Sequence, residues 1–296
     1  MRKKTVAILA PTGMLGSMVY NILKNTYNLV LIYRNKEKLK KIASIYGGLA
    51  KHTTFLFDLT TIYQDYLDAF PASLIGPNTQ KLINGIGDID AVINCAGITK
   101  PHSLKNPAIT FFINGGLPHI LSTIYKNKLI HITTDCVFNG ISGAPYDEDA
   151  PKTPNDLYGI SKSLGEPKES LVLRASIMGP EIDNYVLLIE WLKQQKGKTI
   201  QGFTNHLWNG LTSKQLALAC DQIIHNRNSF PKSGIYHIFS SPLSKYETLL
   251  RLRKRYNIDV QIKPAESTPI DRRLSSKYDV CHKLNIPSLE KMIEEL

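Results

Sequence analysis

The chain is poor in cysteine and has no long apolar run. Its 296 residues include four cysteines, which form no CxxC pair and show no metal-ligand spacing. A disulfide framework or a zinc site is therefore not indicated, and reduced thiols in a cytoplasmic protein are the expectation. No apolar stretch approaches the ~20 residues of a membrane-spanning helix. The apolar run near the start is about five residues, shorter than the ~7–15 of a secretory signal.

Acidic residues are fewer than basic ones: 25 aspartates and glutamates stand against 36 lysines and arginines, so the formal net charge is +11. Such an excess suits nucleic acid, an anionic membrane or an anionic small molecule. The basic residues are spread along the chain, and their densest run, Lys36 to Lys41, predicts a solvated helix face. No nucleic-acid motif is visible. We therefore expect a phosphate-bearing small molecule as the ligand, and neither nucleic acid nor a membrane as a partner.

Short apolar runs alternate with helical patterns over residues 1–175. This alternation predicts a Rossmann-type, doubly wound α/β fold, with a parallel sheet covered on both faces. The expected strands are Lys4–Leu9, Leu29–Tyr33, Phe55–Phe57, Ala91–Cys95, Leu129–Thr133 and Leu171–Ala175. The expected helices are Gly13–Asn25, Lys36–Ile45, two pieces within 59–89, one that runs on to Leu121, and one near Tyr158.

After Ala175 the alternation weakens, and a smaller substrate-binding lobe is expected mainly within 176–296. Part of 210–240 is expected to return to the first domain. The expected elements are helices at Glu181–Gln195, Ser213–Ile224, Ser244–Tyr256 and Ser288–Glu295, with strands at Gly234–Phe239 and Val260–Lys263.

A glycine-containing turn joins the first expected strand to the first helix. A helix N-terminus there offers free N–H groups and a positive dipole end to a pyrophosphate. Gly13 lets the backbone approach a phosphate, and Gly16 lets the helix pack on the sheet. Ala10 stands where the motif usually has its first glycine, so an ordinary strand-to-helix turn is the alternative. The predicted cofactor contacts in this turn are Thr12, Gly13, Met14, Leu15 and Gly16.

The second expected strand ends at Arg34. An acidic residue there would accept hydrogen bonds from a ribose 2′-OH, whereas Arg34 beside Lys36 and Lys38 suits a 2′-phosphate. The sequence therefore favours NADP(H), with NAD(H) as the alternative. A solvated basic turn is the rival explanation. Asp58, at the end of the third strand, is expected near the adenine.

The stretch from Ile130 to Glu166 carries a possible proton-transfer site. Tyr158 and Lys162 are four residues apart on an expected helix, so they share one face. An ammonium near a phenol favours the phenolate and lowers the pKa of the tyrosine. Thr134, at the end of a neighbouring strand, would hold a carbonyl oxygen against that phenol. The Tyr-x-x-x-Lys pattern alone is weak, because most such pairs are a half-buried tyrosine beside a solvated lysine.

The order of the motifs strengthens this interpretation and resembles a known family. The motifs are Gly13-Met-Leu-Gly16, Asp58, Asn94-Cys-Ala-Gly97, Asn114, Thr133-Thr134-Asp135-Cys-Val-Phe138, Tyr158-x-x-x-Lys162 and Arg174-Ala-Ser176. They resemble the extended short-chain dehydrogenase/reductases, and in particular the dTDP-4-dehydrorhamnose reductase branch of nucleotide-sugar 4-keto reductases. The resemblance covers most of residues 4–180 and continues more weakly through 204–210 and 271–276.

The resemblance implies roles for individual residues. Tyr158 would be the proton donor, Lys162 would hold the nicotinamide ribose, and Thr134 would hydrogen-bond the substrate carbonyl. Further implied cofactor contacts are Asp58, Leu59, Cys95, Ala96 and Gly97. The expected substrate contacts are Thr99, Asp135, Cys136, Asn205, Trp208, Arg272 and Arg273. No ligand set matches the metal site of some family members.

Two of these expectations have simple alternatives. Guanidinium groups form paired bonds to phosphate, which makes Arg272 and Arg273 candidates for the nucleotide diphosphate. Surface ion pairs would equally explain them, and Trp208 would equally serve as core. Cys136 stands where the rhamnose enzymes usually have tyrosine, which indicates a different sugar, such as a UDP-linked acetamido sugar.

The expected function is NADPH-dependent reduction of the C4 keto group of a nucleotide-linked 4-keto-6-deoxy sugar, for cell-surface polysaccharide synthesis. One alternative is a non-catalytic NADP-binding protein, like the regulatory β subunit of methionine adenosyltransferase. An epimerase is another, although it would hold NAD tightly, which Arg34 does not favour. A dehydratase is disfavoured because Cys136 replaces its second carboxylate. A homodimer is left open.

Overall fold

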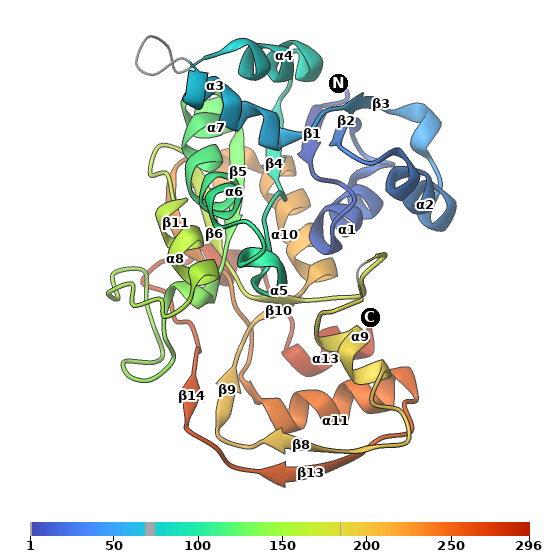
Figure 1. Cartoon of the computed structure of the whole chain (residues 1–296), viewed down its shortest axis with the longest axis vertical. Helices are drawn as coiled ribbons and strands as arrows, with labels where there is room; N and C mark the ends of the chain where they lie inside the picture. The colour runs from blue at the N-terminus through green and yellow to red at the C-terminus, as the bar shows by residue number, and fades with distance from the viewer. Residues whose placement is uncertain (1, 69–74, 184) are drawn as a thin grey trace.

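A seven-stranded parallel sheet forms the centre of the computed structural model, which describes residues 2–68, 75–183 and 185–296 (Figure 1). The strand order is β11-β6-β5-β4-β1-β2-β3. The strands are β1 Thr5–Leu9, β2 Asn28–Tyr33, β3 Thr53–Leu56, β4 Ala91–Asn94, β5 Leu129–Thr133, β6 Leu171–Arg174 and β11 Gly234–His237. The predicted doubly wound fold is confirmed. The order reverses between β1 and β4, and such folds bind ligands at the carboxyl ends of the strands beside that reversal.

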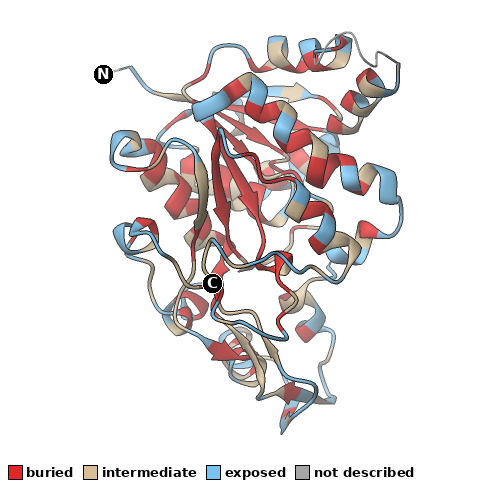
Figure 2. Ribbon diagram, turned by 90° about the vertical axis from the view of Figure 1, so that its left-hand side faces the viewer, coloured by how far each residue is buried: buried red, intermediate tan, exposed pale blue. Residues whose placement is uncertain are grey.

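Alternate residues of β1 supply two separate cores, one on each face of the sheet. Val6 and Ile8 pack with the helices of one face, whereas Ala7 and Leu9 pack with those of the other. Figure 2 shows the buried strands between helices whose outer sides are exposed. The first face is covered by α1 Met14–Leu23, α2 Lys36–Tyr46 and α10 Ser213–His225, and the second by α3 Ile62–Asp68, α4 Pro77–Ile86, α6 Pro107–Phe111 and α7 Leu117–Tyr125.

Side-chain caps determine where several helices begin. The Asn35 side chain accepts a hydrogen bond from the Lys38 N–H and starts α2. Asp156 accepts one from the Gly159 N–H, 2.8 Å away, and starts α8 (Leu157–Leu164), the helix predicted around Tyr158. Because these caps satisfy amides that have no partner within the helix, they fix the first turn of each helix.

The region between β4 and β5 differs from the single helix that the sequence predicts. It is divided into α5 (Lys100–Ser103), α6, a π-helical turn at Phe112–Gly116 and α7. Pro107 stands in the first turn of α6, where a missing N–H costs nothing. By contrast, α7 continues from the π turn, so Pro118 removes a donor inside a continuous helical segment. The π turn places Asn114 at its centre, facing the site described below.

The second half forms a smaller lobe below the sheet in Figure 1. Its strands are short: β7 Ile177–Met178, β8 Thr199–Phe203, β9 His206–Trp208, β10 Leu211–Thr212, β12 Leu243–Ser244, β13 Gln261–Ala265 and β14 Ile270–Asp271. Its helices are α9 Leu188–Lys193, α11 Lys245–Tyr256, α12 Val280–Lys283 and α13 Leu289–Glu294. Its apolar residues join the core on the α1 side of the sheet. No helix within the described ranges is both long and apolar enough to cross a membrane.

The prediction of a helix over Glu181–Gln195 is wrong at its start. The Glu181 carboxylate accepts hydrogen bonds from the Val186 and Leu187 N–H groups, so these amides close a loop, and α9 begins only at Leu188. By contrast, α10 packs on α1 and β11 pairs with β6, so residues 213–237 return to the sheet domain.

Candidate active site

Thr134 and Tyr158 come together at the carboxyl edge of the sheet. Thr134 directly follows β5, and Tyr158 lies on α8, which packs against the turn Asp135–Val137. This packing is close, because a Cβ atom on Gly159 would lie only 2.3 Å from the Cys136 carbonyl oxygen. Glycine at position 159 therefore brings the Tyr158 helix against the Thr134 turn.

Lys162 lies inside this cluster as a buried cation. Its side chain is 4% exposed, and its ammonium donates to the Ile132 carbonyl oxygen at 2.8 Å. Burial lowers the pKa of Lys162 to about 8, although the charge of Glu166 opposes the shift. A lysine whose pKa lies near neutrality is typical of functional sites, where proton transfer requires it.

The predicted lowering of the Tyr158 pKa is not seen. Burial raises this pKa, the neighbouring Cys136 and Asp135 raise it further, and a hydrogen bond with Thr134 lowers it only partly. The physical reason is desolvation, since the phenolate is the form that loses most by leaving water. The Lys162 ammonium, meanwhile, is directed to the Ile132 carbonyl. Tyr158 is therefore held in its protonated form at neutral pH.

The Thr134 hydroxyl is engaged on both sides. It accepts a hydrogen bond from the Cys136 N–H and donates one to the buried Asp135 carboxylate, both at 3.1 Å. Burial raises the pKa of Asp135, and the charge of Arg272 opposes this. Thr134 must therefore turn its proton away from Asp135 before it can donate to a substrate oxygen.

Asn114 completes the cluster and was not among the predicted site residues. Its amide accepts from the Ile98 N–H at 2.8 Å, and donates to the Ile98 carbonyl and to the Ser161 hydroxyl, both at 3.0 Å. It therefore ties the loop after β4 to the helix that carries Tyr158 and Lys162. Asn114 is one of the motif residues on which the family resemblance rests, but its position in the motif order did not show which groups it would join.

The β1–α1 turn has the local structure expected of an anion site, which remains a prediction. Gly13 precedes α1 and supplies no side-chain cap, so the first amides of this ten-residue helix point outward without one. A Cβ atom on Gly16 would lie 2.1 Å from the Ala10 carbonyl oxygen, which confirms the need for glycine there. Ala10 itself adopts a left-handed conformation, with φ of 56°. Thr12 lies half-buried in the turn, Met14 starts the helix, and Leu15 packs into the core.

The loop after β4 adjoins the cluster of Thr134, Tyr158 and Lys162. A Cβ atom on Gly97 would lie 4.0 Å from the Lys162 ammonium, so this loop borders the lysine. The Asn94 side chain accepts from the Ala96 N–H at 3.1 Å and shapes the loop, while burial raises the pKa of Cys95 well above its usual range. The predicted cofactor residues Cys95, Ala96 and Gly97 are therefore brought beside Lys162.

The remaining predicted cofactor residues lie at the β2–β3 edge of the sheet. Arg34 is exposed after β2. Nearby Lys38 forms an ion pair with Asp183. The Asp58 carboxylate accepts hydrogen bonds from the N–H and hydroxyl of Thr60, and Leu59 is buried.

The two adjacent arginines differ. Arg273 holds the Asp271 carboxylate through two nitrogens, with Nη2 at 2.7 Å from Oδ2, so the ion-pair alternative describes it. Arg272 lies against the site, with Nη1 3.7 Å from the Cys136 sulfur and Nη2 3.5 Å from the Asn139 carbonyl. Its Nε is buried without a hydrogen-bond partner. Of the two, Arg272 is the arginine that contacts the Thr134 turn, through Cys136.

Three predicted substrate residues have other contacts. Asn205 binds the Ser267 carbonyl at 2.5 Å within the lobe. Trp208 lies half-buried on β9 and packs on the core and on Gly210. Thr99 is half-buried at the start of α5. Among the described residues, no group of three His, Cys, Asp or Glu side chains is placed to hold a metal ion.

The sheet, the α1 turn and the Thr134–Tyr158–Lys162 cluster define a Rossmann-type α/β protein whose site lies at the carboxyl edge of the sheet. A family model described as the RmlD substrate binding domain matches residues 78–277. The chain belongs to this family, which confirms the resemblance drawn from its motifs.

Known proteins agree with this assignment. The chain is 28% identical over 185 residues to the spore coat polysaccharide biosynthesis protein SpsK of Bacillus subtilis, a match that covers 58% of this chain and 63% of the relative. The chain thus spans less than two thirds of that relative's length.

Solved structures are similar over nearly the whole chain. The dTDP-4-dehydrorhamnose reductase of Bacillus anthracis, in complex with NADP, has a TM-score of 0.70 at 20% identity and covers 99% of this chain and 98% of its own. UDP-N-acetylglucosamine 4-epimerase of Methanobrevibacter ruminantium, in complex with UDP-N-acetylmuramic acid, has a TM-score of 0.72 at 17% identity, over 100% and 97% of the two chains. These likenesses establish the fold.

Proposed function

We propose that the protein is an NADPH-dependent reductase that acts on the C4 keto group of a nucleotide-linked 4-keto-6-deoxy sugar, in the synthesis of cell-surface polysaccharide. The observation that carries the proposal is the meeting of Thr134, Tyr158 and Lys162 in one buried cluster. Its supports are the family membership and the relatives' named roles in reduction and polysaccharide synthesis.

The residues present fit a dinucleotide. The uncapped start of α1 offers amides to the pyrophosphate, Arg34 offers a cation to a 2′-phosphate, and Lys162 borders the Gly97 loop where the nicotinamide ribose would lie. The other residues proposed to line it are Thr12, Gly13, Met14, Leu15, Gly16, Asp58, Leu59, Cys95 and Ala96. When bound, NADPH supplies the hydride.

The side chains divide the remaining work. Tyr158 carries its proton at neutral pH, because the ordinary pKa of a phenol is well above 7 and burial raises it further, and it can donate this proton to the carbonyl oxygen. Thr134 holds that oxygen in place after releasing Asp135. Lys162 stays mostly charged at pH 7 and places a positive charge near the oxygen as it gains electrons.

The substrate contacts follow from the two walls of the site. Asp135, Cys136 and Thr99 are proposed on the sheet side, and Arg272 on the lobe side, where its buried Nε has no hydrogen-bond partner. Asn205 and Trp208 are proposed to shape the lobe around the nucleotide. Arg273 is proposed to act mainly through Asp271. We place the reaction in the cytoplasm, which suits four free cysteines.

The test is NADPH oxidation, followed by its absorbance, with a panel of dTDP- and UDP-linked 4-keto-6-deoxy sugars. Wild type is compared with Tyr158→Phe, which keeps the ring and removes the proton donor. Turnover is expected to fall by at least ~10²-fold, the usual contribution of a positioned acid, while NADPH binding is unchanged. Tyr125→Phe, which removes another buried hydroxyl remote from the cluster, is the matched control.

Other results would support other functions. NADPH binding without turnover of any sugar would contradict the reductase and favour a regulatory protein. Interconversion of two nucleotide sugars without net NADPH consumption would favour an epimerase. Failure to bind either dinucleotide would contradict all three.

A further inference from the structure

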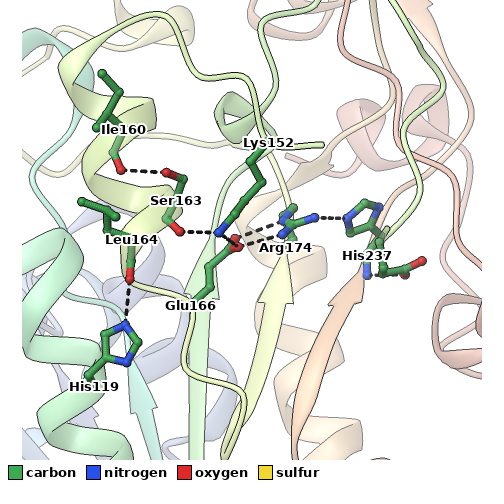
Figure 3. Close-up of polar contacts among 9 residues, drawn as sticks. His119, Lys152, Ile160, Ser163, Leu164, Glu166, Arg174 and His237 are labelled. Atoms are coloured by element: carbon green, nitrogen blue, oxygen red, sulfur yellow. Dashed lines mark hydrogen bonds and ion pairs between the residues drawn. The ribbon is translucent and has the colours of Figure 1, made fainter. Parts of the chain in front are cut away.

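Arg174, Glu166, Lys152 and His237 lie together at the carboxyl ends of β6 and β11 (Figure 3). Arg174 on β6 is 1% exposed and holds the Glu166 carboxylate with two nitrogens, at 3.0 and 2.7 Å. Its remaining Nη1 lies 2.7 Å from Nε2 of His237, which is fully buried at the end of β11. Lys152 reaches the same Glu166 carboxylate from the surface.

Arg174 determines the tautomer of His237. A guanidinium can only donate hydrogen bonds, so Nε2 of His237 must present its lone pair to Nη1. The ring proton of the neutral imidazole is therefore on Nδ1, which lies 2.8 Å from the Ser275 carbonyl oxygen and donates to it. The burial of His237 and the charge of Arg174 both lower its pKa, which keeps the ring neutral.

The Ser275 contact belongs to a small set of bonds around residues 274–277. Glu148 accepts from the His237 N–H at 2.9 Å, from the Ser276 hydroxyl at 2.6 Å and from the Lys277 N–H at 3.0 Å. The Ser275 N–H donates to the Tyr146 carbonyl at 2.7 Å. His237 thus contacts residues 274–277 through its ring and Glu148 through its backbone N–H. These two segments, 146–148 and 274–277, meet beyond the end of the sheet.

Both segments are directly connected to residues of the proposed site. Residues 274–277 directly follow Arg272 and Arg273. Tyr146 stacks on Phe138, with ring centroids 4.2 Å apart, and Phe138 closes the turn that begins at Thr134. The Arg174 guanidinium lies 5.2 Å from the centre of the Phe138 ring.

We propose that His237 is a positioning residue, which Arg174 locks in its Nδ1–H tautomer so that it holds residues 274–277, and with them Arg272, against the Thr134 turn. His237 does not touch the reacting atoms and acts through the segment that carries Arg272. The kinetic part of this proposal rests on the proposed reductase function, whereas its structural part does not.

Two substitutions separate the two ring nitrogens. His237→Asn keeps a donor near Nδ1 for Ser275 and loses the acceptor for Arg174. His237→Gln keeps an acceptor near Nε2 and loses the donor to Ser275. Both replace the imidazole with an amide, but Gln is one methylene longer and nearer to His in volume, so a merely space-filling role would make His237→Gln the milder change, the reverse of the order expected here.

Amide hydrogen exchange of the full chain is the primary measurement, with peptides over 274–277 compared with a β1 peptide. Exchange over 274–277 is expected to quicken about tenfold in His237→Gln, the effect of losing one hydrogen bond, and to stay within about threefold of wild type in His237→Asn. Equal effects in the two variants, or the reverse order, would overturn the proposal.

Nitrogen NMR of the wild-type ring provides a measurement that needs no variant. A proton on Nδ1 and a bare Nε2 at pH 7 are expected, and the opposite tautomer or a protonated ring would overturn the proposal even if His237→Gln does not fold.

The kinetic arm uses the nucleotide sugar that the wild type turns over. His237→Gln should raise KM for the sugar about tenfold, the same single-bond effect, and leave kcat and the Kd of NADPH unchanged. His237→Asn should keep the wild-type KM. A fall in kcat at constant KM would overturn the positioning role. Absence of turnover in the wild type would count against the proposed function, and the exchange and NMR results would still decide this inference.

Discussion

Lys162 and Arg174 are both buried cations at the carboxyl edge of the same sheet, yet their surroundings are opposite. Arg174 is 1% exposed and has a carboxylate and an imidazole as partners. Lys162 is 4% exposed, and its recorded hydrogen bond goes to one neutral carbonyl. Burying a charge is costly unless it is paired. The paired cation therefore stabilises the fold, whereas burial of the poorly paired one costs stability, a cost that the role proposed for Lys162 would explain.

The largest change in stability is expected when Arg174, the paired cation, is replaced. Arg174→Met should lower the free energy of unfolding by roughly 3–5 kcal/mol, because Glu166 would remain buried without its main partner. Chemical denaturation measures this. Arg251→Met is the control, since Arg251 forms a more exposed pair with Glu290 and should cost under ~1 kcal/mol. Similar losses in the two variants would show that the burial of the Arg174 pair carries no special weight.

For Lys162 we expect a change in the free energy of unfolding of the opposite sign. Lys162→Met should abolish the proposed turnover while raising the free energy of unfolding at pH 7, since it removes a charge that burial disfavours. The fall in the Lys162 pKa from 10.5 to about 8 corresponds to roughly 3 kcal/mol. A variant that is less stable than wild type at pH 7 would contradict the assignment of Lys162 as a destabilising group.

The pH dependence of this difference follows from the direction of the pKa shift. Below pH 8 both folded and unfolded chains hold the Lys162 proton, so the cost of burial is fully present. Between about 8 and 10.5 the unfolded chain holds more of this proton, so stability attributable to Lys162 rises with pH. The advantage of Lys162→Met should therefore shrink across this window, as denaturation curves at pH 7, 9 and 10.5 would show.

The local parts of the site could be predicted from sequence because their geometry is local. Tyr158 and Lys162 share a helix face by spacing alone, and Gly16 is required wherever a strand turns sharply into a packed helix. The alternation of apolar runs likewise predicted the sheet. Each of these inferences depends on residues fewer than about ten positions apart, within the reach of helix and turn rules.

Apart from the start of the Glu181 helix, which is a local error, the parts that were missed depend on contacts between distant segments. His237 meets Arg174 across 63 residues, and β8 pairs with β13, both beyond any local pattern. The two adjacent arginines face different partners because the backbone directs successive side chains apart. The direction of the Tyr158 pKa shift depends on burial, which its spacing from Lys162 does not show.

Arg34, an exposed cation, extends the comparison between the two buried cations Lys162 and Arg174. Arg34 is exposed, so Arg34→Ala should leave the free energy of unfolding within about 0.5 kcal/mol, as is usual for surface substitutions. It should lower the preference for NADPH over NADH by ~10–100-fold, the worth of charge-assisted bonds to a phosphate. Binding of both dinucleotides is measured by fluorescence titration. Lys40→Ala, on the exposed face of α2, should change neither, and an unchanged preference in Arg34→Ala would contradict the 2′-phosphate contact.

Ala10 is a second cost located at the proposed cofactor site, and it carries the smallest expected effect. A left-handed conformation costs a non-glycine residue roughly 1–2 kcal/mol. Ala10→Gly removes this strain but adds about 0.4–1 kcal/mol of chain entropy in the unfolded state. A net stabilisation of up to about 1.6 kcal/mol is therefore expected in chemical denaturation.

The same substitution in a helix provides the control for Ala10→Gly. Ala43 lies within α2, where alanine is the best residue, so Ala43→Gly should destabilise by about 1 kcal/mol. Stabilisation by Ala10→Gly together with destabilisation by Ala43→Gly would show that the turn is strained at Ala10. This strain would lower stability, as the burial of the Lys162 charge does. Destabilisation at both positions would mean that packing of the Ala10 methyl group contributes more to stability than its conformation costs. The β1–α1 turn would then stabilise the fold, as the paired Arg174 does, and would not lower its stability, as Lys162 does.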